Sequence, residues 1–163
     1  MTDTLLAPDT AEDTTLDALH HLLQSFRVMQ LHHAHVLHHE AAVRGLNETD
    51  IRLVFFLSVN NDTGITPKQA GEYLELSTGA VTSLIDRLER RGHIERHPNP
   101  DDRRSVIVRL TGSGMEVASS IGAVYRSVFR ESIPAEYLLS LAQGFDKMSA
   151  ALSRVTVTAP LLP

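Results

Sequence analysis

The chain has 163 residues, of which 42% are hydrophobic and 21% are charged, and its formal net charge is -5 at pH 7. Its length fits one domain and its composition is that of a folded protein. It contains no cysteine, which excludes disulfides, thiolate nucleophiles, thiol-based redox sensing and sulfur-ligated zinc.

The sequence shows no sign of membrane insertion or secretion. No stretch approaches the roughly 18 apolar residues that a membrane helix needs. The first residues, MTDTLLAPDTAEDTT, lack the positive charge with which a signal peptide begins. We therefore expect a cytoplasmic protein without a membrane partner.

Positive charge is concentrated in one part of this acidic chain. Seven of the 15 Lys and Arg residues lie between positions 81 and 110, namely Arg87, Arg90, Arg91, Arg96, Arg103, Arg104 and Arg109. Five of the 20 acids share this segment, so it carries 7 - 5 = +2 and the rest carries 8 - 15 = -7. An acidic body with one basic segment suits local contact with DNA, although mixed charges are also usual on solvated helix faces.

The N-terminal part is predicted to be a tail followed by one long helix. Residues 1–13 show no periodicity and are expected to form a flexible tail. From about Thr14, apolar residues recur at helical spacing, and neither proline nor glycine interrupts the pattern before Gly45. A helix of about 30 residues is as long as a whole small domain, so we expect residues 14–45 to take part in a dimer interface.

The next part contains three predicted helix starts. Asn47 is the expected cap of a helix in which Asp50 lies near the positive end of the dipole. Residues 66–69, Thr-Pro-Lys-Gln, combine a hydroxyl cap, proline at the first position and glutamine at the third. Ser77 is expected to cap another helix that ends at residues 91–92. Two short helices joined tightly at residues 75–77 predict a helix-turn-helix.

The second helix of this pair is the candidate recognition helix, which would lie in the major groove. Its apolar residues Val81, Leu84, Ile85 and Leu88 follow helical spacing and should face the core. The candidate DNA contacts are Thr66, Lys68, Ser77, Thr78, Gly79, Thr82, Ser83 and Arg87. Small hydroxyl residues allow a close approach to bases and phosphates. The alternative is an ordinary amphipathic helix with a polar face.

After Gly92 the apolar period changes from helical to two, which predicts a hairpin. Residues 94–97 form the first strand, residues 99–102 the turn and residues 105–110 the return strand. The turn brings Asp102, Arg103 and Arg104 to the tip, where an arginine can enter a narrow minor groove. Asp102 would hold a guanidinium in place if it accepted hydrogen bonds from Arg87 or Arg104. The alternative is a solvent-exposed hairpin that only completes the sheet.

The C-terminal part is predicted to be two helices. Helical spacing runs from Thr111, breaks at residues 132–134, Ser-Ile-Pro, and resumes to Leu152. Residues 156–163 are expected to form a flexible tail.

These segments resemble the MarR family of bacterial transcription regulators. The resemblance is carried by residues 77–88, STGAVTSLIDRL, by residues 91–96, RGHIER, and by residues 102–111, DRRSVIVRLT, with Gly114 following. It implies a mainly α fold with a small β-hairpin wing, formed as a single domain over residues 14–155. In this domain a winged helix-turn-helix at residues 47–111 is flanked by dimerisation helices at residues 14–45 and 112–155.

The resemblance also implies a function. It implies a homodimer on a pseudo-palindromic double-stranded DNA operator, with Arg104 in the minor groove and Arg87 supporting the wing. Many members are repressors released by a small-molecule effector bound between the dimerisation helices and the winged helix, so we expect the same here, with no cofactor. Ser83 stands where some relatives carry a cation, so its base contacts are expected to differ. No catalytic motif is present, and we expect no enzymatic activity.

Five of the nine histidines lie between positions 32 and 39. His32, His35 and His39 share one side of the predicted helix, at spacings compatible with metal ligation. The other histidines of the cluster lie on other faces, and Glu40 is the only evident carboxylate nearby. A structural or ligand-pocket role, a response to pH and a zinc-responsive regulator remain open hypotheses. An enzyme with a histidine metal site and a winged-helix interaction module without DNA binding are further alternatives.

Overall fold

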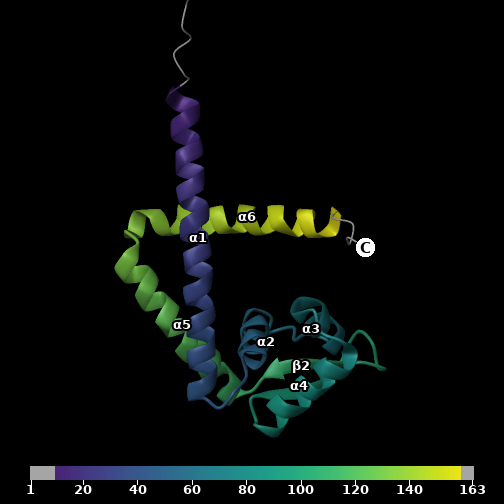
Figure 1. Ribbon diagram of the computed structural model, residues 1–163. Coiled ribbons are helices and arrows are strands. Elements are labelled where there is room, and N and C mark those ends of the chain that lie inside the picture. Colours follow the sequence, from purple (N-terminus) through teal and green to yellow (C-terminus); the bar gives the residue numbers. More distant parts are fainter. Residues whose placement is uncertain (1–9, 159–163) are drawn as a thin grey trace, which may run out of the picture. The chain divides into compact units, whose positions relative to one another are not determined.

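The computed structural model describes residues 10–158, and the side chains of residues 14–155. In chain order the elements are α1 (Thr10–Val43), α2 (Glu48–Val59), α3 (Pro67–Leu74), α4 (Thr78–Arg90), β1 (Ile94–Pro98), β2 (Val106–Leu110), α5 (Gly112–Ser132), the 3-10 helix η1 (Ala135–Tyr137) and α6 (Leu138–Thr158) (Figure 1). The predicted mainly α fold with one hairpin is confirmed. The chain divides into two compact units between Ala118 and Ser119, which are described in turn.

The two long terminal helices extend further than predicted from the sequence. α1 starts at Thr10 and has 34 residues, so it takes in residues 10–13 of the expected N-terminal tail. The sequence has no proline or glycine between positions 9 and 44 that would stop it. α6 likewise takes in residues 156–158 of the expected C-terminal tail. The remainder of both predicted tails, residues 1–9 and 159–163, lies outside the described residues.

The predicted helix caps of the first unit are confirmed. Asn47 caps α2 in a capping box whose third residue is Asp50. The Thr66 hydroxyl accepts a hydrogen bond from the backbone N–H of Gln69 at 3.2 Å, and the Gln69 side chain accepts one from the N–H of Thr66 at 2.7 Å. Ser77 caps α4. Each cap satisfies backbone donors that a helix start leaves open, which fixes where the helices begin.

α3 and α4 pack closely at a tight turn. Glu75 adopts a left-handed conformation with φ of 56°, which ends α3. A Cβ placed on Gly71 would lie 3.2 Å from the Cγ2 atom of Val81 and 3.3 Å from the carbonyl oxygen of Leu76. Glycine at this position therefore lets the two helices approach each other.

The core of the first unit lies between α2, α3, α4 and the hairpin. Its largest fully buried apolar side chains within these elements are Ile51, Leu53, Val54, Leu57, Val81, Ile85, Leu88, Ile94 and Val108. Apolar side chains at helical spacing on α2 and α4 thus meet those of the strands, and their burial drives the packing. The polar face of α4 is left outside.

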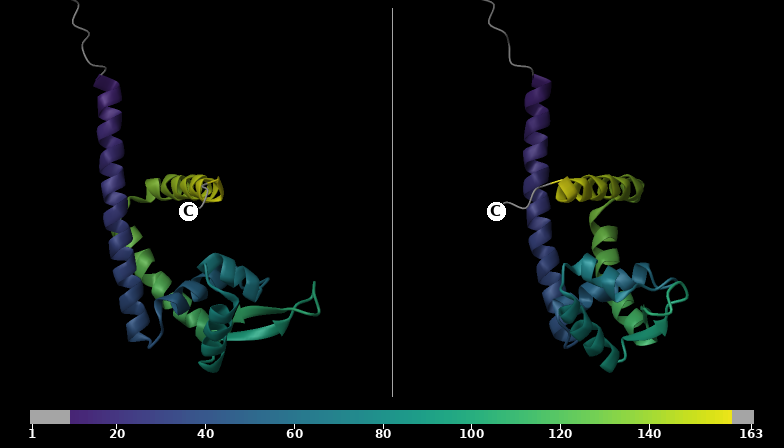
Figure 2. Two further views of the ribbon diagram at one scale, coloured as in Figure 1. Left: turned by 45° about the vertical axis from the view of Figure 1, so that its right-hand side comes forward. Right: turned by 90° about the vertical axis from the view of Figure 1, so that its right-hand side faces the viewer.

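The hairpin is antiparallel, with Ile94 opposite Leu110 and Pro98 opposite Val106. Ile65, just before α3, forms an isolated β-bridge with β2: it exchanges backbone hydrogen bonds of 3.1 and 2.7 Å with Val108. The expected alternation along the return strand is only partly correct: Ile107 is buried together with Val108. Both faces of β2 therefore contribute to the core. The hairpin extends beyond α2–α4 and ends in the loop of residues 99–105 (Figure 2).

α5 begins in the first unit, where it is tied to the end of α4. The Thr111 hydroxyl donates to the carbonyl oxygen of Gly92 at 2.6 Å, and the N–H of Thr111 donates to the carbonyl oxygen of His93 at 3.1 Å. Gly114 packs so closely on this turn that an added Cβ would lie 2.0 Å from the His93 carbonyl oxygen. The start of α5 is therefore fixed on the winged helix-turn-helix.

The second unit holds the rest of α5, η1 and α6. α5 ends just before Pro134, which caps η1, so the predicted break at residues 132–134 is confirmed. An apolar hollow of about 130 Å³ lies at this bend and is lined by Phe129, Ile133, Leu138, Leu141, Ala142 and Phe145. None of the helices in the described part of the chain combines the length and apolarity needed to cross a bilayer.

Candidate nucleic-acid interface

The two faces of α4 differ as the sequence predicts. Val81, Leu84 and Ile85 on the inner face are at most 2% exposed. The candidate contacts on the other side, Ser77, Thr78, Gly79, Thr82 and Ser83, are exposed. The first two turns of α4 therefore present a small, neutral, polar surface.

Several hydroxyls of the candidate site are already engaged within the helices. The Thr82 hydroxyl donates to the carbonyl oxygen of Thr78 at 2.9 Å. The Ser77 hydroxyl accepts from the N–H of Ala80 at 3.4 Å, and the Thr66 hydroxyl belongs to the α3 cap. These groups keep acceptor lone pairs for a ligand while they stabilise the helices that carry them.

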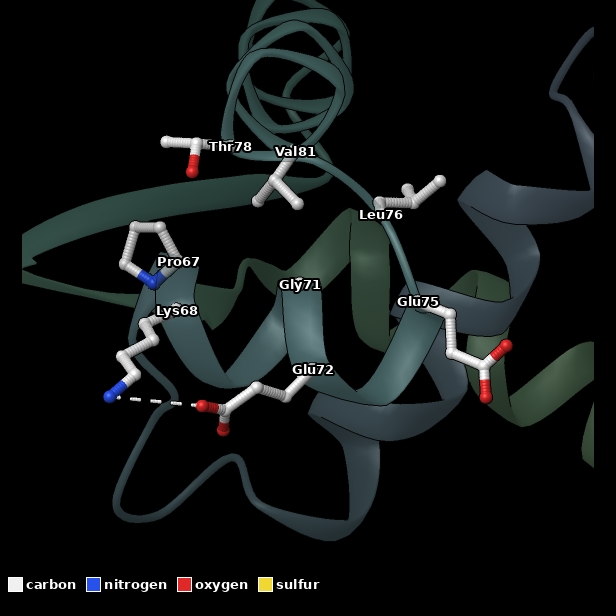
Figure 3. Close-up of a pocket in the computed structure, with 8 residues that line it drawn as sticks. All are labelled: Pro67, Lys68, Gly71, Glu72, Glu75, Leu76, Thr78 and Val81. Carbon is white, nitrogen blue, oxygen red and sulfur yellow. Dashed lines mark ion pairs between the residues drawn. The ribbon is translucent and has the colours of Figure 1, made fainter. Parts of the chain in front are cut away.

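A hollow of about 400 Å³ separates the starts of α3 and α4 and is lined by Pro67, Lys68, Gly71, Glu72, Glu75, Leu76, Thr78 and Val81 (Figure 3). It brings the candidates Lys68 and Thr78 to one place. The Lys68 ammonium lies 3.8 Å from the Glu72 carboxylate, and these side chains are 85% and 65% exposed. So exposed an ion pair is weak, and Lys68 can turn towards another anion.

The loop of the hairpin is held by its own hydrogen bonds. The Asn99 amide donates to the Ser105 hydroxyl at 2.7 Å, and the side-chain oxygen of Asn99 accepts from the N–H of Asp101 at 3.0 Å. Asp102 accepts from the backbone N–H of Arg104 at 2.9 Å. The hypothesis that Asp102 holds a guanidinium is therefore wrong in this structure: the carboxylate shapes the loop backbone instead.

Arg103 and Arg104 lie exposed at this loop. Within the described part of the chain, no acid lies within ion-pairing distance of either guanidinium. The loop thus presents two cations on an internally hydrogen-bonded turn. Such a turn can offer arginine to an anionic groove.

Arg87 forms its ion pair with α2 and not with the hairpin, where the resemblance places its role. Its guanidinium forms an ion pair with Asp50 of α2, with the Nη2 atom 2.5 Å from Oδ1. This partner was not predicted from the sequence, although Asp50 lies four and seven residues before Val54 and Leu57 on the apolar side of α2. An acid on an apolar stripe signals a buried cation nearby.

Arg96 was also missed as part of the site. From β1 it pairs with Asp86 at 2.6 Å and also with Glu89, both on α4. Arg96 shares a face of β1 with the buried Ile94. The acids of the candidate recognition helix are thereby bound to the hairpin, which links the orientations of the two elements.

The histidine cluster is not arranged as a metal site in the described part of the chain. His32, His35 and His39 are all exposed, and the rings of His32 and His35 meet edge to face, 6.2 Å apart. The described residues contain no group of three potential ligands placed to hold a metal ion. His38 instead contacts the carboxylate of Glu48 at 2.8 Å, which was not predicted from the sequence.

The segment that carries the candidate interface is also the one that is similar to known proteins. The model of the MarR family matches residues 44–105, which include α2, the helix-turn-helix, β1 and the hairpin loop. YcgE of Bacillus subtilis, named an HTH-type transcriptional regulator, is 45% identical over 82 residues, which are 48% of this chain and 51% of YcgE. Residues 44–105 of the chain thus resemble the MarR family.

Other similarities point to the same family. The multiple antibiotic resistance protein MarR of Escherichia coli is 43% identical over 53 residues, 32% of this chain and 37% of that protein. The chain thus spans about half or less of the curated relatives that it matches. The solved complex of MepR from S. aureus with DNA has a TM-score of 0.55 at 18% identity, covering 79% of this chain and 98% of MepR. This likeness shows that the fold of the chain is similar to that of MepR over more than the matched segment.

Proposed function

We propose that this chain is a DNA-binding transcription regulator of the MarR family. The observation that carries the proposal is the pairing of an exposed polar face on α4 with the exposed Arg103 and Arg104 on the adjacent hairpin loop. Both belong to the segment that matches the family. The names of the relatives as transcriptional regulators, and the complex of MepR with DNA, support the same function.

The geometry suggests how the duplex is bound. The first two turns of α4 enter the major groove, where the small side chains Gly79, Thr82 and Ser83 approach the base edges. Arg104 reaches the minor groove, and Lys68 contacts a phosphate. Phosphate contacts supply most of the affinity and make it depend steeply on salt.

We further propose that the regulator is a cytoplasmic homodimer that binds a pseudo-palindromic operator as a repressor and is released by a small molecule. α1 supports the dimer, because Leu16, Leu19 and Leu23 are each about half exposed along one side of it. A two-fold dimer would present two copies of α4 to two half-sites. Repression and effector release rest on the family resemblance.

Titration of an operator by mobility shift tests the DNA-binding proposal. The operator is first selected from genomic fragments with the wild-type protein. Arg104→Ala should lower its affinity by roughly 1–3 kcal/mol. Arg130→Ala, which removes the same charge from the exposed end of α5, should leave it unchanged. A wild-type protein that selects no fragment, or whose binding does not change between low and high salt, would overturn the proposed function.

A further inference from the structure

Asp50 is the one charged side chain in the described part of the chain that is fully buried, with 0% exposure. A buried carboxylate is costly unless it is paired and hydrogen-bonded. Both of its oxygens are satisfied: Oδ2 accepts from the backbone N–H of Asn47 at 2.8 Å, and the remaining bonds come from Arg87. Its position in the core therefore depends on both partners.

Arg87 approaches this carboxylate with two nitrogen atoms. Nε lies 3.1 and 3.2 Å from the two oxygens, and Nη2 lies 2.5 Å from Oδ1. A guanidinium bound by two of its nitrogens has one orientation, unlike a lysine ammonium, which acts as a point charge. Its side chain is only 31% exposed, so the group faces the protein rather than a ligand.

The same carboxylate also fixes the turn that joins α1 to α2. Asn47 follows directly after that turn, which Gly45 enters with φ of 62° and which the N–H of Leu46 closes by donating to the carbonyl oxygen of Ala41 at 2.9 Å. Asp50 thus connects the turn after α1 with the third turn of α4, where Arg87 lies 37 residues further along the sequence than Asp50.

We propose that Asp50 and Arg87 are positioning residues for operator recognition: their ion pair sets the orientation of α4 relative to α1, and Arg87 does not contact DNA. The inference rests on the proposed function. Because α1 is the expected dimer helix, the orientation of α4 relative to α1 would set the separation of the two recognition helices in the dimer. The pair would then determine which half-site spacing the dimer accepts.

Replacing Asp50 distinguishes a positioning role from direct contact, because the two roles predict opposite results. If Arg87 bound phosphate, Asp50→Asn would release it from its acid and raise affinity or leave it unchanged. If Arg87 positions α4, Asp50→Asn should lower operator affinity at least tenfold. The variant is nearly isosteric and keeps an acceptor for the N–H of Asn47.

The experiment is a mobility-shift titration of the full-length wild type, Asp50→Asn, Arg87→Lys and the double variant at several salt concentrations. We expect each single variant to lose at least tenfold in operator affinity. The double variant should bind no more weakly than whichever single variant binds more weakly. The slope of log affinity against log salt should stay unchanged. Lys68→Ala is the matched control, since loss of a cation that contacts a phosphate should reduce that slope by about one.

Two further readouts separate positioning from general destabilisation. Circular dichroism and thermal unfolding show which variants are folded at the assay temperature; Arg87→Lys keeps the charge and serves if Asp50→Asn does not fold. Operators with one base pair inserted between the half-sites should be rejected by the wild type and tolerated better by the folded variants. Unchanged affinity in a folded variant, or a slope reduced by about one for Arg87→Lys, would overturn the proposal. Absence of wild-type binding would instead overturn the proposed function itself.

Discussion

Gly79 is a residue whose presence the fold does not require. It lies in the first turn of α4, with no positive φ, and a Cβ placed on it would meet nothing within 4 Å. Glycine in a helix costs about 0.5–1 kcal/mol relative to alanine. A position that weakens the helix without any packing reason suggests that something outside the chain comes close to the backbone there.

We therefore predict that Gly79→Ala raises stability and lowers operator affinity. The free energy of unfolding should increase by about 0.5–1 kcal/mol, measured by urea denaturation. Operator affinity should fall several-fold, because the methyl group holds the helix away from the base edges. Gly144→Ala in α6, where a Cβ also meets nothing within 4 Å, is the control that should stabilise without weakening DNA binding. Equal or tighter binding by Gly79→Ala would contradict this account.

For single residues, the interactions that could be predicted from the sequence were those between near neighbours in the chain. The caps at Thr66 and Ser77 depend on residues within three positions, so their pattern is visible in the chain itself. The partner of Arg87 is 37 residues away, and only the packing of α2 on α4 brings the two together. The role expected for Asp102 failed for a similar reason, because a backbone N–H two residues away is closer than any guanidinium.

Among the elements, the start of α5 has the strictest steric requirement. A Cβ on Gly114 would lie 2.0 Å from the carbonyl oxygen of His93 and 2.9 Å from the Cδ2 atom of Leu110. The backbone of the turn after α4 cannot move away easily, because Thr111 is hydrogen-bonded to Gly92 and His93. The hairpin, the end of α4 and α5 therefore meet at one tightly packed point.

Gly114→Ala should destabilise the protein, because overpacking at such a point costs about 1–3 kcal/mol or more. Urea denaturation measures the change. Gly112→Ala, two residues earlier in the same helix with nothing within 4 Å of an added Cβ, should leave stability unchanged or slightly raised. If both variants unfold at the same urea concentration, the close approach at Gly114 does not determine how stably α5 packs on the turn after α4.

The helices and the hairpin were predicted with bounds close to those observed, because their apolar periods differ clearly. The β-bridge between Ile65 and Val108 could not be predicted, since a single paired residue produces no periodic pattern in the sequence. Burial of Ile107 was missed for a related reason: a period of two assumes that one face of the strand is solvated, and both faces of β2 are covered.

For the whole molecule, the sequence indicates a dimer, in which a second copy of the chain covers α1. α1 has 34 residues, which makes it about 50 Å long. Within its described side chains only Leu37 and Ala41, near its C-terminal end, are buried. The sequence could indicate a long helix with an apolar side, but periodicity does not identify what covers that side. The dimer consequently stays a prediction.

Leu19→Glu should weaken this dimer. Leu19 is 55% exposed and lies between Leu16 and Leu23 on one side of α1, so a charge there would be buried against the second copy and left unpaired. Light scattering of the wild type should give twice the 18.0 kDa mass of the chain, and the variant should shift towards the monomer. Operator affinity should fall with it, because a dimer gains from binding two half-sites at once. His21→Glu adds the same charge on the opposite side of α1 and should remain dimeric. Full dimerisation of Leu19→Glu would show that this side of α1 is not the interface.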